Sequence, residues 1–332
     1  MFGYLMKRLF IMIPTLLAIS FLVFLIIQAP PGDYLTTYIN ELQSQGETAA
    51  QEKIEFLRAQ YGLDQPFLVQ YLTWVAGLLQ GDLGYSFEYN LPVHDVVGDR
   101  LLLTVIVSVA TIIFIWLVSF PIGIYSATHQ YSVSDYTLTF VGFLGLATPS
   151  FLLALVLLYF ANVTFGTSIG GLMDPSYIGE PWSWGKAGSV LAHLWVPVIV
   201  IGTSGTAAMI RRLRANLLDE LQKQYVVTGR AKGLPPGRLL LKYPLRMSLN
   251  PFISDIGSIL PDVISGAVIV SVVLSLPTTG PMLLDALRSQ DMYLAGSFLM
   301  FLAVLTVIGV FISDIALAIL DPRIRLGAGA AK

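Results

Sequence analysis

Long apolar runs alternate with shorter polar segments along the chain. A bilayer core about 30 Å thick requires roughly 20 apolar residues per spanning helix. Six stretches meet this requirement: residues 9–28, 101–127, 137–165, 190–210, 250–275 and 292–320. The pattern therefore predicts an all-α membrane protein with six transmembrane helices.

The polar segments between these runs differ in character. Residues 29–100 carry ten acidic and three basic residues and include the amphipathic stretch "AAQEKIEFLRAQYG", so we expect a small external domain there. Residues 166–189 form a second loop, whose Trp182 and Trp184 suit the headgroup zone. The expected division is a first span in 1–28, an external segment in 29–100, and a five-helix core in 101–332 that contains a cytoplasmic segment, 211–248.

The segment 211–248 has a pattern of its own. In "RRLRANLLDELQKQYVV" the apolar side chains recur at helical spacing, which indicates an amphipathic helix: Leu213, Leu217, Leu218, Leu221 and Tyr225. Gly233 is suited to a left-handed helix end, and Pro235 and Pro236 stop the helix and preset the next turn. We expect a helix, a tight turn and a second helix.

Composition supports a membrane location. A mean hydropathy of +0.73 excludes an ordinary soluble domain, and the chain is 55% hydrophobic and 12% charged. The cysteine count of 0 excludes disulfides and thiolate metal sites. The apolar run after Lys7 and Arg8 is longer than a usual signal-peptide core, so we interpret it as a retained anchor.

The distribution of cations predicts the orientation. With the amino terminus inside, 14 of the 19 Lys and Arg residues are cytoplasmic, and nine of these lie in 211–246. Because Lys and Arg that flank spans are retained in the cytoplasm, we expect both termini to be cytoplasmic.

Short motifs in the sequence suggest two functional classes for a membrane protein of this kind. The sequence "GTSG" at 202–205 resembles the nucleophile motif of intramembrane serine proteases, but such a serine needs a histidine base. The histidines are His94, His129 and His193, and the fifth and sixth spans have none. We therefore expect these small residues to serve close helix packing.

Acidic residues within spans suggest the second class, a stand-alone proton-driven transporter. These residues are Asp255, Asp262 and Asp314. No inverted repeat of the kind found in many secondary transporters is visible, which disfavours that class.

The fifth span carries a polar stripe. Asp255, Ser258, Asp262 and Ser265 fall at i, i+3, i+7 and i+10, an arc of about 80° on a helix. Such a stripe faces either a water-filled pathway or polar groups on a neighbouring helix. These four residues are the candidate translocation pathway, and helix-to-helix hydrogen bonding is the alternative.

Several blocks carry a family resemblance. "YVVTGRAKGLPPGRLLLKYPLRMSLNP" resembles the cytoplasmic coupling loop of binding-protein-dependent ABC importer permeases, in the branch for oligopeptides, dipeptides, nickel and some oligosaccharides. "YGLDQPFLVQY", "LQGDLGYSF", "LATPSFLLALVLLY" and "LPTTGPMLLDALRSQDMYLAGS" are similar to further blocks of that family. The loop keeps the family's Gly233 and Leu245, and "TGRAKG" is similar to the peptide branch's T-A-R-A-K-G, with Gly229 in place of alanine.

The resemblance implies a type I importer permease in a bacterial or archaeal inner membrane, with no catalytic residue, metal or cofactor of its own. It implies four further subunits: a second homologous permease, two cytoplasmic ATPases that bind ATP and Mg, and an external substrate-binding protein. No nucleic acid is expected. The ATPase-coupling residues would be Thr228, Gly229, Arg230, Ala231, Lys232, Gly233 and Leu234. Peptide and oligosaccharide both remain open as cargo, since "SLPTTGPMLLDALRSQDMYLAGS" resembles sugar-carrying relatives.

Overall fold

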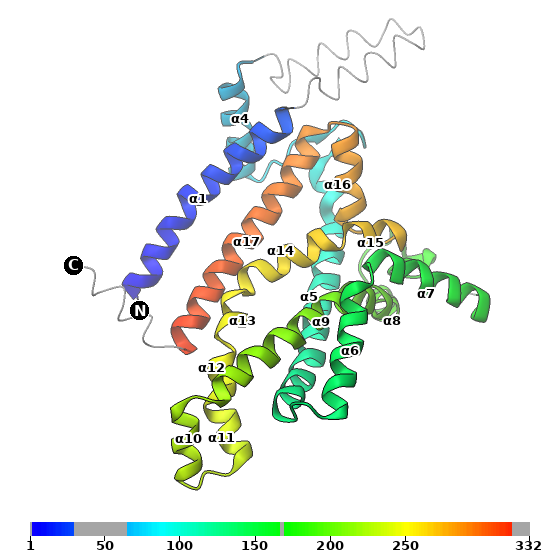
Figure 1. Ribbon diagram of the computed structural model, residues 1–332. Coiled ribbons are helices and arrows are strands. Elements are labelled where there is room, and N and C mark those ends of the chain that lie inside the picture. Colours follow the sequence, from blue (N-terminus) through cyan, green and yellow to red (C-terminus); the bar gives the residue numbers. More distant parts are fainter. Residues whose placement is uncertain (1, 30–64, 167–168, 321–332) are drawn as a thin grey trace, which may run out of the picture. The chain divides into compact units, whose positions relative to one another are not determined.

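The computed structural model describes residues 2–29, 65–166 and 169–320 (Figure 1). Within them the chain is helical apart from one small hairpin and the connecting loops. Five segments in this part are long and apolar enough to cross a membrane, or six if one bent helix pair is a single span. This agrees with the predicted helical membrane protein. The amphipathic stretch expected at 49–62 lies outside the described residues.

The described chain forms two compact units, and two of the boundaries between them fall inside long helices. Among the described residues, the second unit comprises 2–29, 65–103 and 278–307, and the first comprises 104–166, 169–277 and 308–320. The long helices that contribute to both are α5 (Val93–Thr128) and α17 (Met292–Leu320).

The second unit is built around an aromatic cluster. Phe24 of α1 (Phe2–Gln28) packs against Phe67, Tyr71 and Trp74 of α4 (Phe67–Gln80), with ring centroids 5.2 to 5.6 Å apart. Ser20 Oγ and Tyr71 Oη are 2.8 Å apart. Aromatic pairs at these distances contribute beyond their buried area, so this contact fixes α4 on α1.

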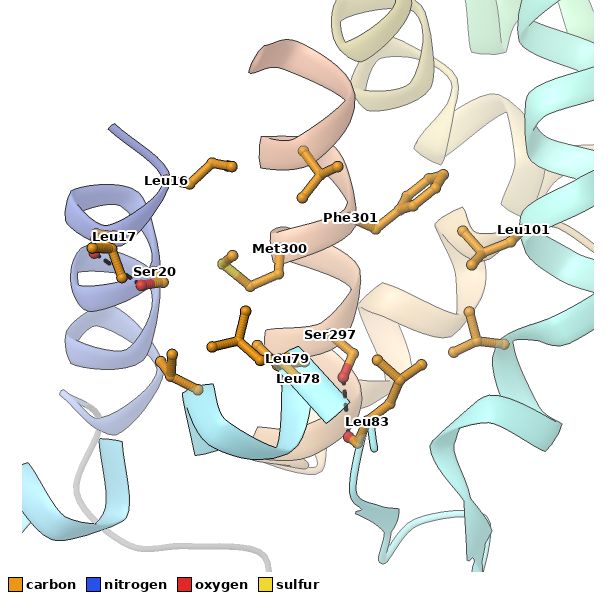
Figure 2. Close-up of a pocket in the computed structure, with 13 residues that line it drawn as sticks. Leu16, Leu17, Ser20, Leu78, Leu79, Leu83, Leu101, Ser297, Met300 and Phe301 are labelled. Carbon is orange, nitrogen blue, oxygen red and sulfur yellow. Dashed lines mark hydrogen bonds between the residues drawn. The ribbon is translucent and has the colours of Figure 1, made fainter. Parts of the chain in front are cut away.

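An apolar groove of about 380 Å³ opens between α1, α4, α5 and α17 within the second unit (Figure 2). Leucines from α1, α4 and α5 line it together with Met300 and Phe301. Its two hydroxyls have partners, because Ser20 Oγ bonds at 2.8 Å and Ser297 Oγ donates to Leu83 O at 3.2 Å. The surface of the groove is therefore predominantly apolar.

A short hairpin precedes α5. Strands β1 (Tyr85–Ser86) and β2 (Leu91–Pro92) pair antiparallel, and α16 (Thr279–Arg288) lies in the same unit. Asp291, fully buried, holds the hairpin: it accepts hydrogen bonds from Ser86 Oγ at 2.6 Å, Glu88 N at 3.1 Å and Leu294 N at 3.1 Å. The last of these bonds satisfies a free N–H in the first turn of α17.

The first unit is organised around α9 (Trp195–Leu221), which packs against α6 (Val133–Ala147), α7 (Ser150–Phe165) and α12 (Pro244–Ser248). A further set of elements completes the unit: η1 (Pro175–Tyr177), α8 (Trp184–His193), α10 (Gln224–Ala231), α11 (Pro236–Lys242), α13 (Asn250–Ser254), α14 (Ile256–Gly266) and α15 (Val268–Val273).

The third span was predicted as one helix over 137–165, and this is wrong, because two helices, α6 and α7, cover this range. Helices α6 and α7 meet at an angle of 95°. Thr148 and Pro149 adopt extended backbone conformations, with ψ of 117° and 132°. A residue before proline is driven out of the helical region, which explains the break.

The fifth predicted span, 250–275, is divided into α13, α14 and α15. The joints at Asp255 and Ala267 keep right-handed helical angles. Within the same unit α14 touches α17 backbone to backbone, because a Cβ added to Gly309 would lie 2.9 Å from the Gly257 Cα. Ser313 Oγ donates to Ile253 O at 2.6 Å, so α17 also holds the end of α13.

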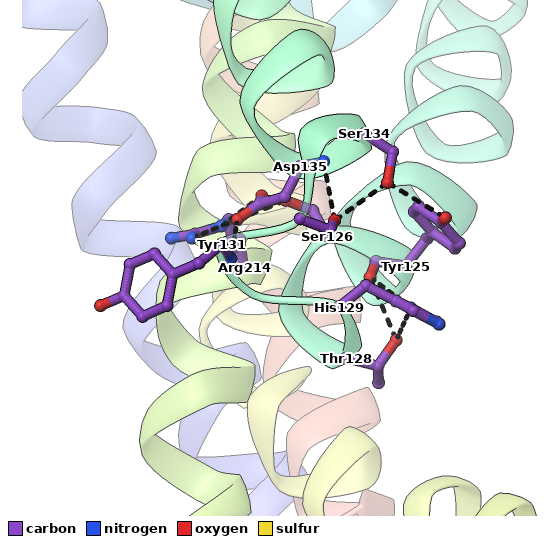
Figure 3. A network of polar contacts seen from close by, with 9 residues as sticks. Tyr125, Ser126, Thr128, His129, Tyr131, Ser134, Asp135 and Arg214 are labelled. Atoms are coloured by element: carbon purple, nitrogen blue, oxygen red, sulfur yellow. Dashed lines mark hydrogen bonds and ion pairs between the residues drawn. The ribbon is translucent and has the colours of Figure 1, made fainter.

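A buried ion pair joins α5, α6 and α9 (Figure 3). Arg214 Nη2 and Nε lie 2.8 and 2.9 Å from the two carboxylate oxygens of Asp135, which is only 2% exposed. Ser126 of α5 donates to the same carboxylate. Removing one partner would leave a buried charge uncompensated, so the three helices are strongly tied here.

Candidate functional site

The segment expected to couple to a partner begins as a continuation of α9. This helix is 27 residues long and runs from the apolar span into the amphipathic region without interruption. Of the apolar face predicted for this helix, Leu213 and Leu217 are fully buried, and Leu218 and Leu221 are half-buried. The span begins at Trp195 rather than at residue 190, because α8 ends at His193.

The predicted tight turn follows α10 (Figure 1). Gly233 has a φ of +74°, its N–H donates to Arg230 O at 2.9 Å, and Leu234 N donates to Gly229 O at 3.2 Å. These two bonds form the Schellman arrangement that ends a helix at a left-handed glycine. Pro236 then occupies the first turn of α11, where its missing N–H has no cost. The predicted tight turn, with a helix on each side, is confirmed. The amphipathic helix predicted over 211–227 is broken, because α9 ends at Leu221 and Lys223, with an extended ψ of 148°, separates it from α10.

Helices α10 and α11 form a hairpin with a small core of its own. Val226 and Leu239 are 1% and 3% exposed. Gly229 lies beneath Leu239, since a Cβ added there would be 2.5 Å from Leu239 Cδ1. The glycine at this position thus lets the two short helices approach closely, and the Leu239 side chain would have to shift for an alanine.

The tip of the hairpin is exposed and cationic. Five of the seven predicted coupling residues are exposed, Leu234 is half-buried and Gly229 is buried. The exposed five are Thr228, Arg230, Ala231, Lys232 and Gly233. Because 227–246 contains no acidic residue, the surface offered at the tip is positively charged.

Tyr225 was predicted as part of the apolar face of the amphipathic helix, whereas it lies exposed in α10, at the base of the hairpin. Tyr225 Oη donates to Glu220 of α9, and its ring lies 6.4 Å from that of Tyr243. Partial burial, together with the bond to Glu220, raises the pKa of Tyr225, so the phenol stays protonated as a donor. The base therefore fixes α10 relative to the end of α9.

The residues of the polar stripe predicted in the fifth span lie on one side of α14. Ser258, Asp262 and Ser265 are exposed, whereas Gly257 and Ile264 on the opposite side of α14 are buried. Asp255 is bound to Arg212 of α9, whose guanidinium also lies 5.0 Å from the Phe252 ring centroid. Sequence reasoning missed this pair, because the two residues are 43 positions apart.

The "GTSG" motif serves packing. A Cβ added to Gly202 would lie 2.7 Å from Phe114 Cδ1, and one added to Gly205 would lie 2.7 Å from Ile115 Cδ1. These glycines let α9 approach α5 closely, as expected of small residues in spans. His193 lies on α8, with Nδ1 2.8 Å from Ser189 O.

Comparison with protein-family models gives two matches. A model described as "Binding-protein-dependent transport system inner membrane component" matches residues 119–326. A model of the amino-terminal part of such membrane components matches residues 1–110. The first match includes α9, the α10–α11 hairpin and the polar stripe.

Curated relatives match along nearly the whole chain. The oligopeptide transport system permease protein AppB of Bacillus subtilis is 34% identical over 338 residues, covering 98% of this chain and 100% of the relative. A putative peptide permease protein of Brucella ovis is 32% identical, with coverage of 98% and 100%. The dipeptide transport system permease protein DppB of Escherichia coli K12 is 29% identical, with coverage of 98% and 99%.

Proposed function

The chain belongs to the family of binding-protein-dependent transport system inner membrane components, and from this premise we propose that it is the permease subunit of an ATP-driven importer of oligopeptides or dipeptides. It is a transport subunit rather than an enzyme. The peptide cargo is supported by the names of the relatives reported above. The observation that carries the ATP-driven mechanism is the exposed, cationic α10–α11 hairpin with its left-handed Gly233.

The energy comes from partner subunits. The sequence has no G-x-x-x-x-G-K-[ST] loop, which is the usual phosphate cradle of nucleotide-binding proteins. We propose that the hairpin tip, residues 228–234, docks into a cytoplasmic ATPase and moves with it. A second permease, a second ATPase and an external binding protein complete the importer, with both termini of this chain in the cytoplasm.

We propose that the polar stripe of α14 lines the transport pathway. Ser258, Asp262 and Ser265 face out of this chain, where a water-filled cavity shared with the second permease would cover them. Asp255 belongs to the same stripe, and its pair with Arg212 joins it to the helix that leads into the hairpin. We propose that movement of α9 changes the access of this stripe to the two sides of the membrane.

Transport by the assembled importer tests the function. The chain is reconstituted in proteoliposomes with its second permease, its ATPases and its binding protein, and uptake of a labelled dipeptide and a labelled hexapeptide is measured. We expect uptake that requires both ATP and the binding protein. A labelled trisaccharide is the matched alternative cargo.

Two results would contradict the proposal. ATP-dependent uptake of the trisaccharide with no peptide uptake would assign the importer to oligosaccharides. Peptide uptake that continues without ATP would remove the coupling role of the hairpin.

A further inference from the structure

A second groove, separate from the one in Figure 2, lies between α6 and α9 in the first unit. Its volume is about 190 Å³. Its walls are mostly apolar, with Leu138, Gly142, Phe143 and Leu146 on α6 and Ala207 and Ile210 on α9, and Thr139 adds one hydroxyl. The two helices run antiparallel, because Gly145 lies near Thr203 and Asp135 lies near Arg214.

One end of the groove carries guanidinium groups. Arg211 and Arg214 line it, and Arg212 follows on the same turn of α9. Arg212 is paired with Asp255, and Arg214 with Asp135 (Figure 3). Arg211 is exposed, and the described part of the chain places no carboxylate within ion-pair distance of it. The groove therefore has a largely apolar body and a positive end to which the described residues supply no carboxylate for Arg211.

In the sequence, the charged end of the groove comes directly after the apolar part of the predicted fourth span. The stretch from Trp195 to Ile210 has no charged residue, and Arg211 is the first cation after it. Lipid phosphates occupy this depth, and basic pockets between spans on the cytoplasmic side bind anionic lipid headgroups. The orientation proposed above puts Arg211 in the cytoplasmic leaflet, which holds the anionic lipids.

We propose that the α6–α9 groove binds one anionic phospholipid, with its phosphate on Arg211 and part of one acyl chain between Gly142, Phe143 and Ile210. The size fits a segment of chain, since an apolar cavity of about 150 Å³ accommodates one benzene molecule. Charge favours a lipid over the face of another subunit, because spans that cover an apolar groove rarely supply a carboxylate.

The proposed lipid would lie beside the buried ion pair of Arg214 and Asp135. Arg214 lines the groove and also holds Asp135 and Ser126, so a bound acyl chain would pack beside the buried pair that ties α5, α6 and α9. This inference does not depend on what the importer carries.

Two variants test the two halves of the site. Arg211→Gln removes the charge, and Gly142→Leu fills the groove. A Cβ added at Gly142 meets nothing within 4 Å, and leucine is a better helix former than glycine, so this variant is expected to fold. The controls are Lys7→Gln, an exposed cation at the cytoplasmic end of α1, and Gly98→Leu, a helical glycine that also has open space.

The complete importer is purified from membranes of phosphatidylethanolamine and phosphatidylglycerol, and bound lipid is counted by native mass spectrometry. We expect wild type and both controls to retain one phosphatidylglycerol per copy of this chain. Arg211→Gln should bind it about fivefold more weakly, the effect of one cation near the membrane surface. Gly142→Leu should also retain less of it, because the leucine side chain fills the space for the acyl chain. Added inorganic phosphate should not displace the lipid.

Three outcomes would overturn the proposal. The first is equal retention of phosphatidylglycerol by Gly142→Leu and wild type. The second is displacement by inorganic phosphate, which would indicate a simple anion site. The third comes from Gly142→Cys in this cysteine-free chain: protection from a lipid-soluble maleimide in the delipidated importer would show that another subunit covers the groove.

Discussion

At Gly233 the backbone takes a φ of +74°, and the two hydrogen bonds that end α10 require that conformation. A Cβ at this position would meet no neighbouring atom within 4 Å, so any effect of a substitution is conformational. A branched side chain in the left-handed region costs about 1 kcal/mol or more.

Gly233→Val should therefore distort the hairpin tip and uncouple transport from ATP hydrolysis. We expect uptake per ATP hydrolysed to fall at least about fivefold, the factor that corresponds to this penalty. Gly237→Val is the matched control, because Gly237 lies in α11 without a positive φ and also has open space. Unchanged coupling in Gly233→Val, measured in proteoliposomes, would rule out a docking role for this turn.

Asp291 gives a second prediction at this scale. Its burial raises the pKa of the carboxyl, although Ser86 Oγ and backbone N–H groups favour the ionised form. The folded chain then binds the proton more tightly than the unfolded chain, whose Asp pKa is about 3.9. The stabilisation is complete below that pH and is lost as the pH rises toward the folded-state pKa.

Thermal unfolding in detergent from pH 4.5 to 7.5 measures this effect. The stability of wild type relative to Asp291→Asn should fall as the pH rises, because the asparagine does not titrate. A difference between wild type and Asp291→Asn that is constant with pH would show that the carboxyl of Asp291 titrates equally in both states.

Helix α14 presents one polar face, which lines a water-filled pathway or bonds to a neighbouring helix. Labelling of introduced cysteines distinguishes these two interpretations. Cysteines are introduced singly from 255 to 269, and a water-soluble thiol reagent is added with and without trapping of ATP. A pathway predicts labelling at 258, 262 and 265, sparing of 260 and 264, and a change in labelling when the importer is trapped. In this chain Ile264 is already buried, whereas Ser258, Asp262 and Ser265 are exposed.

The alternative interpretation, hydrogen bonding to a neighbouring helix, predicts a different labelling result. Protection of the polar face in every state, in an importer that still assembles and transports, would mean that the stripe bonds to a neighbouring helix. The pathway would then have to lie on another helix.

Elements with local causes were predictable from the sequence. The turn at Gly233 follows from one glycine and two prolines, and α17 follows from an apolar run without a break. The break at Thr148 was missed, because a hydropathy window averages over the single proline that causes it. The pairs Arg212–Asp255 and Arg214–Asp135 were also missed, since each joins segments far apart in the sequence.

At the scale of the whole molecule, the chain depends on other subunits for energy. Proteoliposomes that contain this chain alone should neither bind ATP nor accumulate peptide under an imposed proton gradient, because the sequence has no phosphate-binding loop. Labelled ATP and labelled dipeptide measure the two properties, and the complete importer is the positive control. Gradient-driven uptake by the isolated chain would support a secondary transporter instead.

Helix α9 is an unbroken rod of 27 residues, about 40 Å long at 1.5 Å per residue. Its two ion pairs, through Arg212 and Arg214, clamp it near one end. From Arg214 the rod extends about 10 Å to the hairpin and about 28 Å to Trp195. If α9 tilts as a rigid body about Arg214, the distance to Trp195 is nearly three times the distance to the hairpin. A small displacement of the hairpin would then produce a displacement nearly three times as large at Trp195.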